Sequence, residues 1–151
     1  MKNWIEPNKN IKAKLLYRLT KDGNLSSEFH KRCDNKGRTL TLFSLVDGNI
    51  IGIYTPLSWE SNHIWKSDMN SFIFSLNDNQ KYKKIKENYS IYCNEISGPC
   101  AGNLTCEGPS LSYIYNMKFS SFEVYENDNK ILENQVYPKL NEIEVFEIAF
   151  S

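Results

Sequence analysis

The Asp47-Gly48 pair, which separates two apolar runs, is the feature that most constrains the fold of this chain. The two runs are Thr39–Val46 and Asn49–Thr55. Asp-Gly tolerates the positive φ angles that a tight two-residue turn between strands requires. Since Thr39–Val46 carries apolar residues on both faces, we expect it to be a central strand. The sequence therefore predicts a β-hairpin in the middle of a sheet.

Other segments show the alternation of apolar and polar residues that is typical of half-buried strands. In Ser71–Leu76, the residues Phe72, Phe74 and Leu76 share one face, and Ile143–Phe150 alternates in the same way. Three more segments are candidate strands, namely Tyr89–Cys93, Leu111–Tyr115 and Phe119–Tyr125.

Three segments are less regular. Residues Lys14–Thr20 fit a strand or a helix. We expect the lysine-rich segment Asn77–Asn88 and the segment Glu95–Pro109, rich in Gly, Pro and Cys, to be loops.

One short helix is predicted after a turn at Lys21–Asn24. Leu25, Phe29 and Cys33 recur at helical spacing and form a narrow apolar stripe. We expect Ser26 or Ser27 to cap this helix and Gly37 to end it. The pattern as a whole predicts an α+β fold, mostly an antiparallel β-sandwich with one or two short flanking helices. Residues 1–13 are expected to be a loose N-terminal arm and residues 14–151 a single domain.

Charge and hydropathy limit the classes of function. The 151-residue chain has 18 basic and 18 acidic residues, and such a neutral chain is poorly suited to bulk binding of nucleic acid. No apolar run approaches the ~20 residues of a membrane-spanning helix, and no secretory signal is visible at the N-terminus. We therefore expect an intracellular protein, a monomer by default, whose four cysteines are free thiols.

His30 and Cys33 lie three residues apart on the predicted helix, so their side chains can approach each other. One hypothesis is an oxidisable thiolate at Cys33, activated by a nearby imidazolium; the other is an inert, buried thiol. The remaining cysteines, Cys93, Cys100 and Cys106, lack the paired spacing of structural zinc sites. We expect no metal ion, no cofactor and no hydrolytic triad, since there are only two histidines.

Several residues are candidates for an interaction surface. Lys81, Lys83 and Lys84 either attract an acidic partner or a membrane surface, or belong to a solvated loop. Trp59 and Trp65 either anchor a partner or close one end of the sandwich. Glu144 is either a buried structural carboxylate or a contact residue.

Short motifs occur in a fixed order along the chain, from Leu15 to Ile148. They are Leu15–Gly23, Phe29-His30, Cys33-Asp34, Lys36-Gly37, Thr39–Leu42, Gly52–Thr55, Ser58-Trp59, Lys66–Asp68, Ser71–Leu76, Tyr92–Asn94, Gly98-Pro99 and Glu142–Phe146. This ordered set resembles the TLDc domain of oxidation-resistance proteins. The resemblance is strong before Pro99, and the sequence diverges in its C-terminal half.

The resemblance implies a β-sandwich with flanking helices that acts as an intracellular, non-catalytic interaction domain without a cofactor. It also implies a link to protection against oxidative stress and binding of the vacuolar proton-pumping ATPase. The expected partner is then a protein, such as subunits of that pump, and the expected location is cytoplasmic, at the periphery of endolysosomal membranes.

Two other functions stay open at this point. One is a redox-active thiol protein that senses or scavenges oxidant through Cys33 or through Cys93, Cys100 and Cys106. The other is a small-ligand-binding sandwich whose pocket is formed by the segment Gly98–Pro109.

Overall fold

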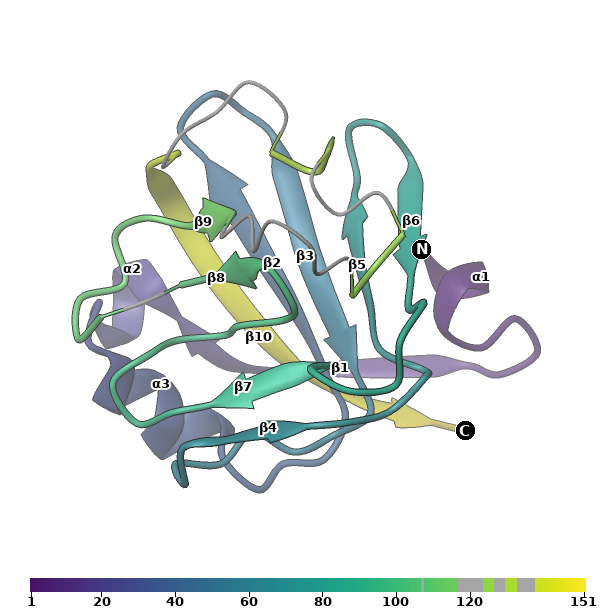
Figure 1. Cartoon of the computed structure of the whole chain (residues 1–151), viewed down its shortest axis with the longest axis horizontal. Helices are drawn as coiled ribbons and strands as arrows, with labels where there is room; N and C mark the ends of the chain where they lie inside the picture. Colours follow the sequence, from purple (N-terminus) through teal and green to yellow (C-terminus); the bar gives the residue numbers. More distant parts are fainter. Residues whose placement is uncertain (107, 117–123, 127–129, 133–137) are drawn as a thin grey trace.

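A six-stranded antiparallel sheet forms the centre of the molecule, with the strand order β1-β10-β2-β3-β5-β6 (Figure 1). A computed structural model of the chain describes residues 1–106, 108–116, 124–126, 130–132 and 138–151. The strands of this sheet are β1 (Ile11–Arg18), β2 (Thr39–Leu45), β3 (Ile50–Thr55), β5 (Phe72–Ser75), β6 (Gln80–Lys83) and β10 (Leu140–Phe150). The last strand of the chain thus lies between the first two.

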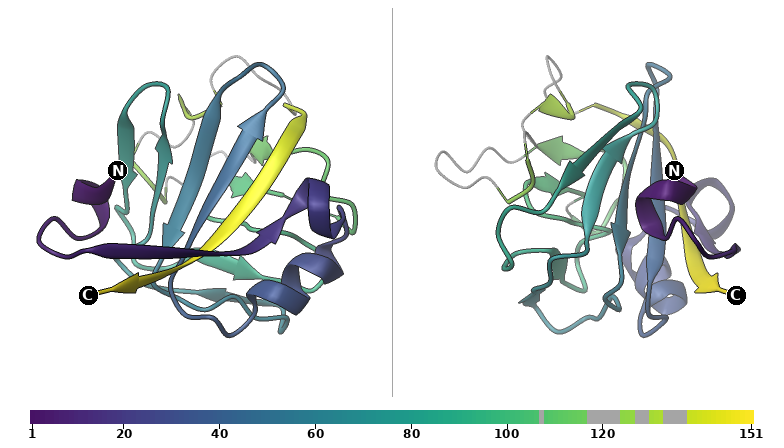
Figure 2. Two further views of the ribbon diagram at one scale, coloured as in Figure 1. Left: turned by 180° about the vertical axis from the view of Figure 1, so that it is seen from behind. Right: turned by 90° about the vertical axis from the view of Figure 1, so that its right-hand side faces the viewer.

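A second layer covers the inner face of this sheet (Figures 1 and 2). It contains two short two-stranded sheets and the loops between them. Its strands are β4 (Ile64–Lys66), β7 (Ile91–Cys93), β8 (Leu104–Thr105) and β9 (Tyr115–Asn116). The larger apolar cluster, which includes Phe43, Ile53 and Ile73 of the large sheet and Ile91 and Leu104 of the second layer, lies between the two layers.

The three helices in the described part of the chain are short and lie at the margins of the sandwich. The helices α2 (Leu19–Asp22) and α3 (Ser26–Cys33) follow β1 at one end of the molecule, and α1 (Lys2–Ile5) lies against the outer face of the sheet (Figure 2). A smaller apolar cluster on that outer face includes Leu40, Tyr54, Phe72 and Phe74, and α1 packs on it through Trp4. The antiparallel, β-rich sandwich expected from the sequence is confirmed. Among the described residues, no helix has the length and apolar character needed to cross a membrane.

The central hairpin is confirmed, but its turn is longer than the two residues expected, and only Gly48 of the Asp-Gly pair has a positive φ. The backbone N–H of Leu45 donates to the carbonyl oxygen of Asn49 at 2.8 Å, and Gly48 has a φ of 91°. Strand β2 lies between β10 and β3, as expected of a central strand. The alternation predicted for β5 and β10 is also confirmed, because Phe72, Phe74, Leu76, Phe146, Ile148 and Phe150 all belong to the outer apolar cluster.

The prediction of a loop over Asn77–Asn88 is wrong, because this segment contains β6, which pairs with β5. Tyr82 packs against the inner core, while the neighbouring Lys81 extends over the outer face, where its ammonium lies 4.1 Å from the centre of the Phe72 ring. Lysines with long apolar stems therefore occupy positions where sequence reasoning expects apolar residues.

Two other strand assignments need correction. Only Tyr115 of the range Leu111–Tyr115 belongs to a strand, and the predicted loop Glu95–Pro109 contains the two-residue strand β8. Most of the range Phe119–Tyr125 lies outside the described residues. Residues 14–20 form the end of β1 and the start of α2, and the expected arm, residues 1–13, contains α1 and the start of β1.

The predicted limits of the helix after the Lys21–Asn24 turn are also wrong. Leu25 is the N-cap of α3, and no side chain caps the helix; the hydroxyl of Ser26 instead donates to the carbonyl of Glu95 at 3.1 Å. The helix ends at Cys33, before Gly37, because Asp34 adopts extended backbone angles. The Ser26 hydroxyl, which we expected to cap the helix, thus bonds instead to Glu95, a residue distant along the chain.

We predict that Gly52→Ala destabilises the fold by about 2 kcal/mol or more, because forced overpacking in a sheet interior shifts the backbone. A Cβ at Gly52 would lie 2.5 Å from the carbonyl oxygen of Thr41 and still closer to the Phe74 ring. Urea denaturation measures the loss. Gly48→Ala is the comparison, since that turn residue has open space around it and only its positive φ opposes a side chain. An equal loss in both variants would contradict the steric explanation.

Candidate functional site

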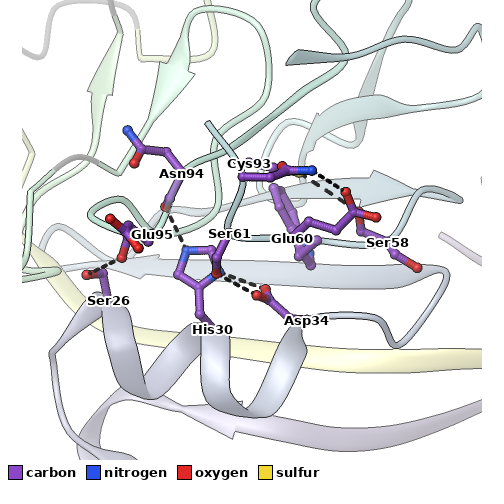
Figure 3. A network of polar contacts seen from close by, with 12 residues as sticks. Ser26, His30, Asp34, Ser58, Glu60, Ser61, Cys93, Asn94 and Glu95 are labelled. Carbon is purple, nitrogen blue, oxygen red and sulfur yellow. Dashed lines mark hydrogen bonds and ion pairs between the residues drawn. The ribbon is translucent and has the colours of Figure 1, made fainter. Parts of the chain in front are cut away.

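His30 lies in a buried polar network that joins α3 to the loop after β7 (Figure 3). Its Nδ1 is 2.7 Å from a carboxylate oxygen of Asp34, and its Nε2 is 2.7 Å from the carbonyl oxygen of Asn94 and 2.8 Å from that of Ser97. Only 7% of the residue is exposed. Both ring nitrogens are therefore engaged, and His30 serves as a connector between α3 and residues 94–97.

Asp34 extends this network to a third segment, the loop after β3. Its second carboxylate oxygen accepts a hydrogen bond from the Ser61 hydroxyl at 2.6 Å, and the backbone N–H of Asn35 donates to the carbonyl of Trp59 at 2.9 Å. Together, His30 and Asp34 fix the C-terminal end of α3 against the 58–61 and 94–97 loops. The arrangement is a structural junction.

The Cys33 thiol is fully buried in the inner core. Burial raises the pKa of this thiol far above its ordinary value, and the negative charge of Asp34 raises it further. The hypothesis of a thiolate activated by His30 therefore finds no support in the geometry, because the imidazole is directed to the 94–97 loop.

The other three cysteines are also buried, and all four are free thiols, as expected. Burial raises the pKa of Cys93 and raises that of Cys106 well above its ordinary value. One alternative expected the segment Gly98–Pro109 to form a ligand pocket. Its part Gly98–Cys106 instead packs its own side chains into the protein, including the buried Cys100, Ala101 and Leu104. No group of three or more Cys, His, Asp or Glu side chains that could hold a metal is present in the described part of the chain.

Two of the expected interaction residues do not lie on the surface. Trp59 has no exposed area; its indole N–H donates to the Thr39 hydroxyl at 2.9 Å, and its ring packs edge-on against Phe29. Lys84 is only 6% exposed, and its ammonium donates to the carbonyl of Asn88 at 2.7 Å. Both residues stabilise the fold, since each side chain finds its polar partner inside the molecule.

The remaining candidates keep some exposed surface and lie on three different strands, β4, β10 and β6. Trp65 is half-buried and stacks on Tyr92 with 4.8 Å between ring centres. Glu144 pairs with Arg18 across β1 and β10 at 2.5 Å, and such partly exposed pairs contribute little to stability. Lys81 and Lys83 lie on β6, on the outer face of the large sheet.

A groove of about 640 Å³ next to α3 was missed by sequence reasoning. Its apolar margins are Leu25 and Ile96, which are 50% and 54% exposed, and Lys31, Asp34 and Glu95 give it mixed charge. The apolar stripe of the helix could have indicated it, because Leu25 is the stripe residue that the core leaves uncovered.

The comparison with known families agrees with this architecture. The family profile described as the TLDc domain matches residues 1–149, nearly the whole chain. The chain belongs to the TLDc domain family. No curated protein sequence matched it.

Four of the motifs by which this TLDc domain resembles its family meet at the junction around α3. Phe29-His30 and Cys33-Asp34 lie on or next to the helix, Ser58-Trp59 lies in the loop bonded to its end, and Asn94 accepts from His30. These motifs therefore specify how the layers are joined.

We predict that His30→Ala lowers the free energy of unfolding by about 2–4 kcal/mol, because it leaves buried carbonyl and carboxylate acceptors unpaired. Urea denaturation measures the change. His63→Ala is the control, since His63 is exposed and lies 3.4 Å from an exposed Glu95 carboxylate. Because His63 has a φ of 56°, where alanine is mildly strained, that variant is expected to lose about 1 kcal/mol at most. A loss at His30 no larger than at His63 would refute the connector role.

We predict that a thiol-reactive probe modifies none of the four cysteines at an appreciable rate in the folded protein at about pH 8, because thiolates are the reactive species. All four are expected to react after unfolding in guanidinium, which serves as the positive control. Rapid labelling of one cysteine in the folded state would show a reactive thiol that the burial and the raised pKa values do not explain.

Proposed function

We propose that this TLDc domain is a protein-interaction domain that acts without catalysis, and that its partner is the vacuolar proton-pumping ATPase. The family assignment supports a domain of the oxidation-resistance type. The choice of the pump comes from the resemblance of the sequence motifs to that family. In this proposal the domain works at the cytoplasmic side of endolysosomal membranes.

The observation that carries the proposal is the burial of all four thiols. A redox function needs an accessible cysteine with a lowered pKa, whereas burial raises the pKa of Cys33, Cys93 and Cys106. His30, the buried histidine, uses both ring nitrogens in structural contacts, one with Asp34 and one with the 94–97 loop. The cysteines and His30 thus serve in packing and internal hydrogen bonds, which favours a binding role over a catalytic one.

The proposal predicts direct binding to the purified pump without consumption of peroxide. Binding of the immobilised domain to the intact pump complex would be measured in parallel with peroxide removal by the same protein preparation. Saturable binding that a Cys33→Ala variant retains, with no peroxide turnover, is the expected result.

The opposite pattern would overturn the proposal. If the domain fails to bind the pump and removes peroxide with sulfenic acid forming at a defined cysteine, the redox-thiol function is correct. Gly52→Ala, expected to be unstable, is a control for binding by unfolded protein.

A further inference from the structure

The outer face of the large sheet carries a second groove, of about 440 Å³, between α1 and the ends of β3, β5 and β6. We call it the cationic groove, defined by Arg38, Tyr54, Phe72, Lys81, Lys83 and Phe150. Its size lies in the range of sites that bind ligands. Trp4 of α1 forms one wall, and the stacked rings of Tyr54 and Phe72, 5.0 Å apart, form part of the apolar floor.

Positive charge is concentrated in this groove. Arg38, Lys81 and Lys83 line it, and Glu6 supplies the one carboxylate among its described lining residues. Lys84 also borders the groove, but its ammonium is bonded to the carbonyl of Asn88 inside the molecule. The chain as a whole has equal numbers of acidic and basic residues, so the imbalance is local. The ion pairs found among the described residues include neither Arg38 nor Lys81 nor Lys83.

Contacts with the groove walls hold two of these cations in place. The Lys81 ammonium donates to the carbonyl of Trp4 at 2.6 Å and lies 4.1 Å from the centre of the Phe72 ring. The Arg38 guanidinium lies 4.8 Å from the centre of the Phe150 ring. Cations positioned in this way lose less side-chain entropy when they pair with an anion.

The positive charges of Lys81 and Lys83 repel each other in the groove. Partial burial lowers the pKa of Lys81, and the charge of Lys83 lowers it further. A carboxylate bound between these two ammonium groups would relieve both effects, because an opposite charge favours the protonated lysine.

The spacing of the two lysines favours an extended peptide as the source of the carboxylates. Lys81 and Lys83 occupy alternate positions of β6 and therefore share one face, with about 6.6–6.8 Å between such positions along a strand. The alternate side chains of an extended peptide repeat at the same distance. A peptide with acidic residues at every second position can thus meet both lysines at once.

We propose that the cationic groove binds an extended, acidic segment of a partner protein, with Lys81, Lys83 and Arg38 pairing its carboxylates. The inference rests on the proposed function in one respect, since it requires a protein partner. A concave groove whose key cation is half-buried is unsuited to a flat lipid surface, and the neutral chain is unsuited to nucleic acid. The other groove, beside α3, carries both acidic and basic residues, so its charge does not indicate what kind of partner it would bind.

The test uses a fluorescein-labelled peptide that alternates glutamate and threonine, with binding followed by fluorescence anisotropy. We expect saturable binding that weakens with added salt and is lost for the same peptide with glutamine in place of glutamate. Lys81→Gln/Lys83→Gln is expected to weaken binding about tenfold or more, since each lysine supplies a charge-assisted hydrogen bond.

A matched control variant is available on the opposite edge of the sheet. Lys12→Gln/Lys14→Gln removes two exposed lysines with the same spacing from β1 and is expected to leave binding unchanged. If the β6 variant unfolds, Arg38→Gln replaces it, with an expected loss of about threefold to tenfold for one ion pair. A thermal unfolding curve shows whether each variant is folded.

Three results would overturn the inference. They are the absence of peptide binding, equal loss in the β1 and β6 variants, and binding of phosphatidylserine vesicles through Lys81 and Lys83 without binding of the peptide. The pump assay keeps the two proposals separate. If the pump binds and the peptide does not, only the cationic groove is refuted; if the peptide binds and the pump does not, only the choice of partner is refuted.

Discussion

The insertion of β10 between β1 and β2 is the constraint on which the rest of the structure depends. Residues Ile11 and Phe150 pair near the two ends of the chain, and Leu140 pairs with Leu45 at the far end of the same strand. Without β10, β1 has no neighbour in the large sheet, and α2 and α3, which follow β1, lose their anchor. Because such long-range pairing must form before the core closes, the whole sandwich is coupled to its last strand.

The same strand links the two faces of the sheet, which have different characters. Ile143 and Val145 of β10 belong to the inner core, where the second layer buries all four thiols, while Phe146 and Ile148 belong to the outer cluster, which α1 covers in part. Burial on the inner face removes reactivity, since it disfavours the thiolate. The partly covered outer face keeps apolar and charged groups within reach of a partner, and Phe150 brings β10 into the cationic groove.

Local signals in the sequence were sufficient for the central hairpin, whose strands are neighbours along the chain, and for the outer faces of two strands with an alternating pattern. The hairpin around Asp47-Gly48 follows from turn chemistry, and the outer-face residues of β5 and β10 follow from strict alternation. The strand β6 was missed because Lys81 and Lys83 stand at its outward positions, so the sequence does not show the alternation of apolar and polar residues expected of a half-buried strand. The ends of α3 were missed because the Ser26 hydroxyl bonds to Glu95, a partner distant along the chain. The burial of Trp59 likewise depends on Thr39 and Phe29, which only the folded chain brings together.

The basic residues of the cationic groove, unlike its aromatic residues Tyr54 and Phe72, lie outside the family motifs, so recognising the family does not reveal the charge that we propose for binding. The motif residues Phe29, His30, Asp34 and Trp59 form the junction that holds the layers, and their side chains point inward or to neighbouring loops. Lys81 and Lys83 lie outside every motif, on an edge strand of the sheet. Lys83 is solvent-exposed, whereas Lys81 is half-buried against Trp4 and Phe72. In the proposed binding mode, the junction residues determine the fold, whereas the charge on β6 determines which partner the groove accepts.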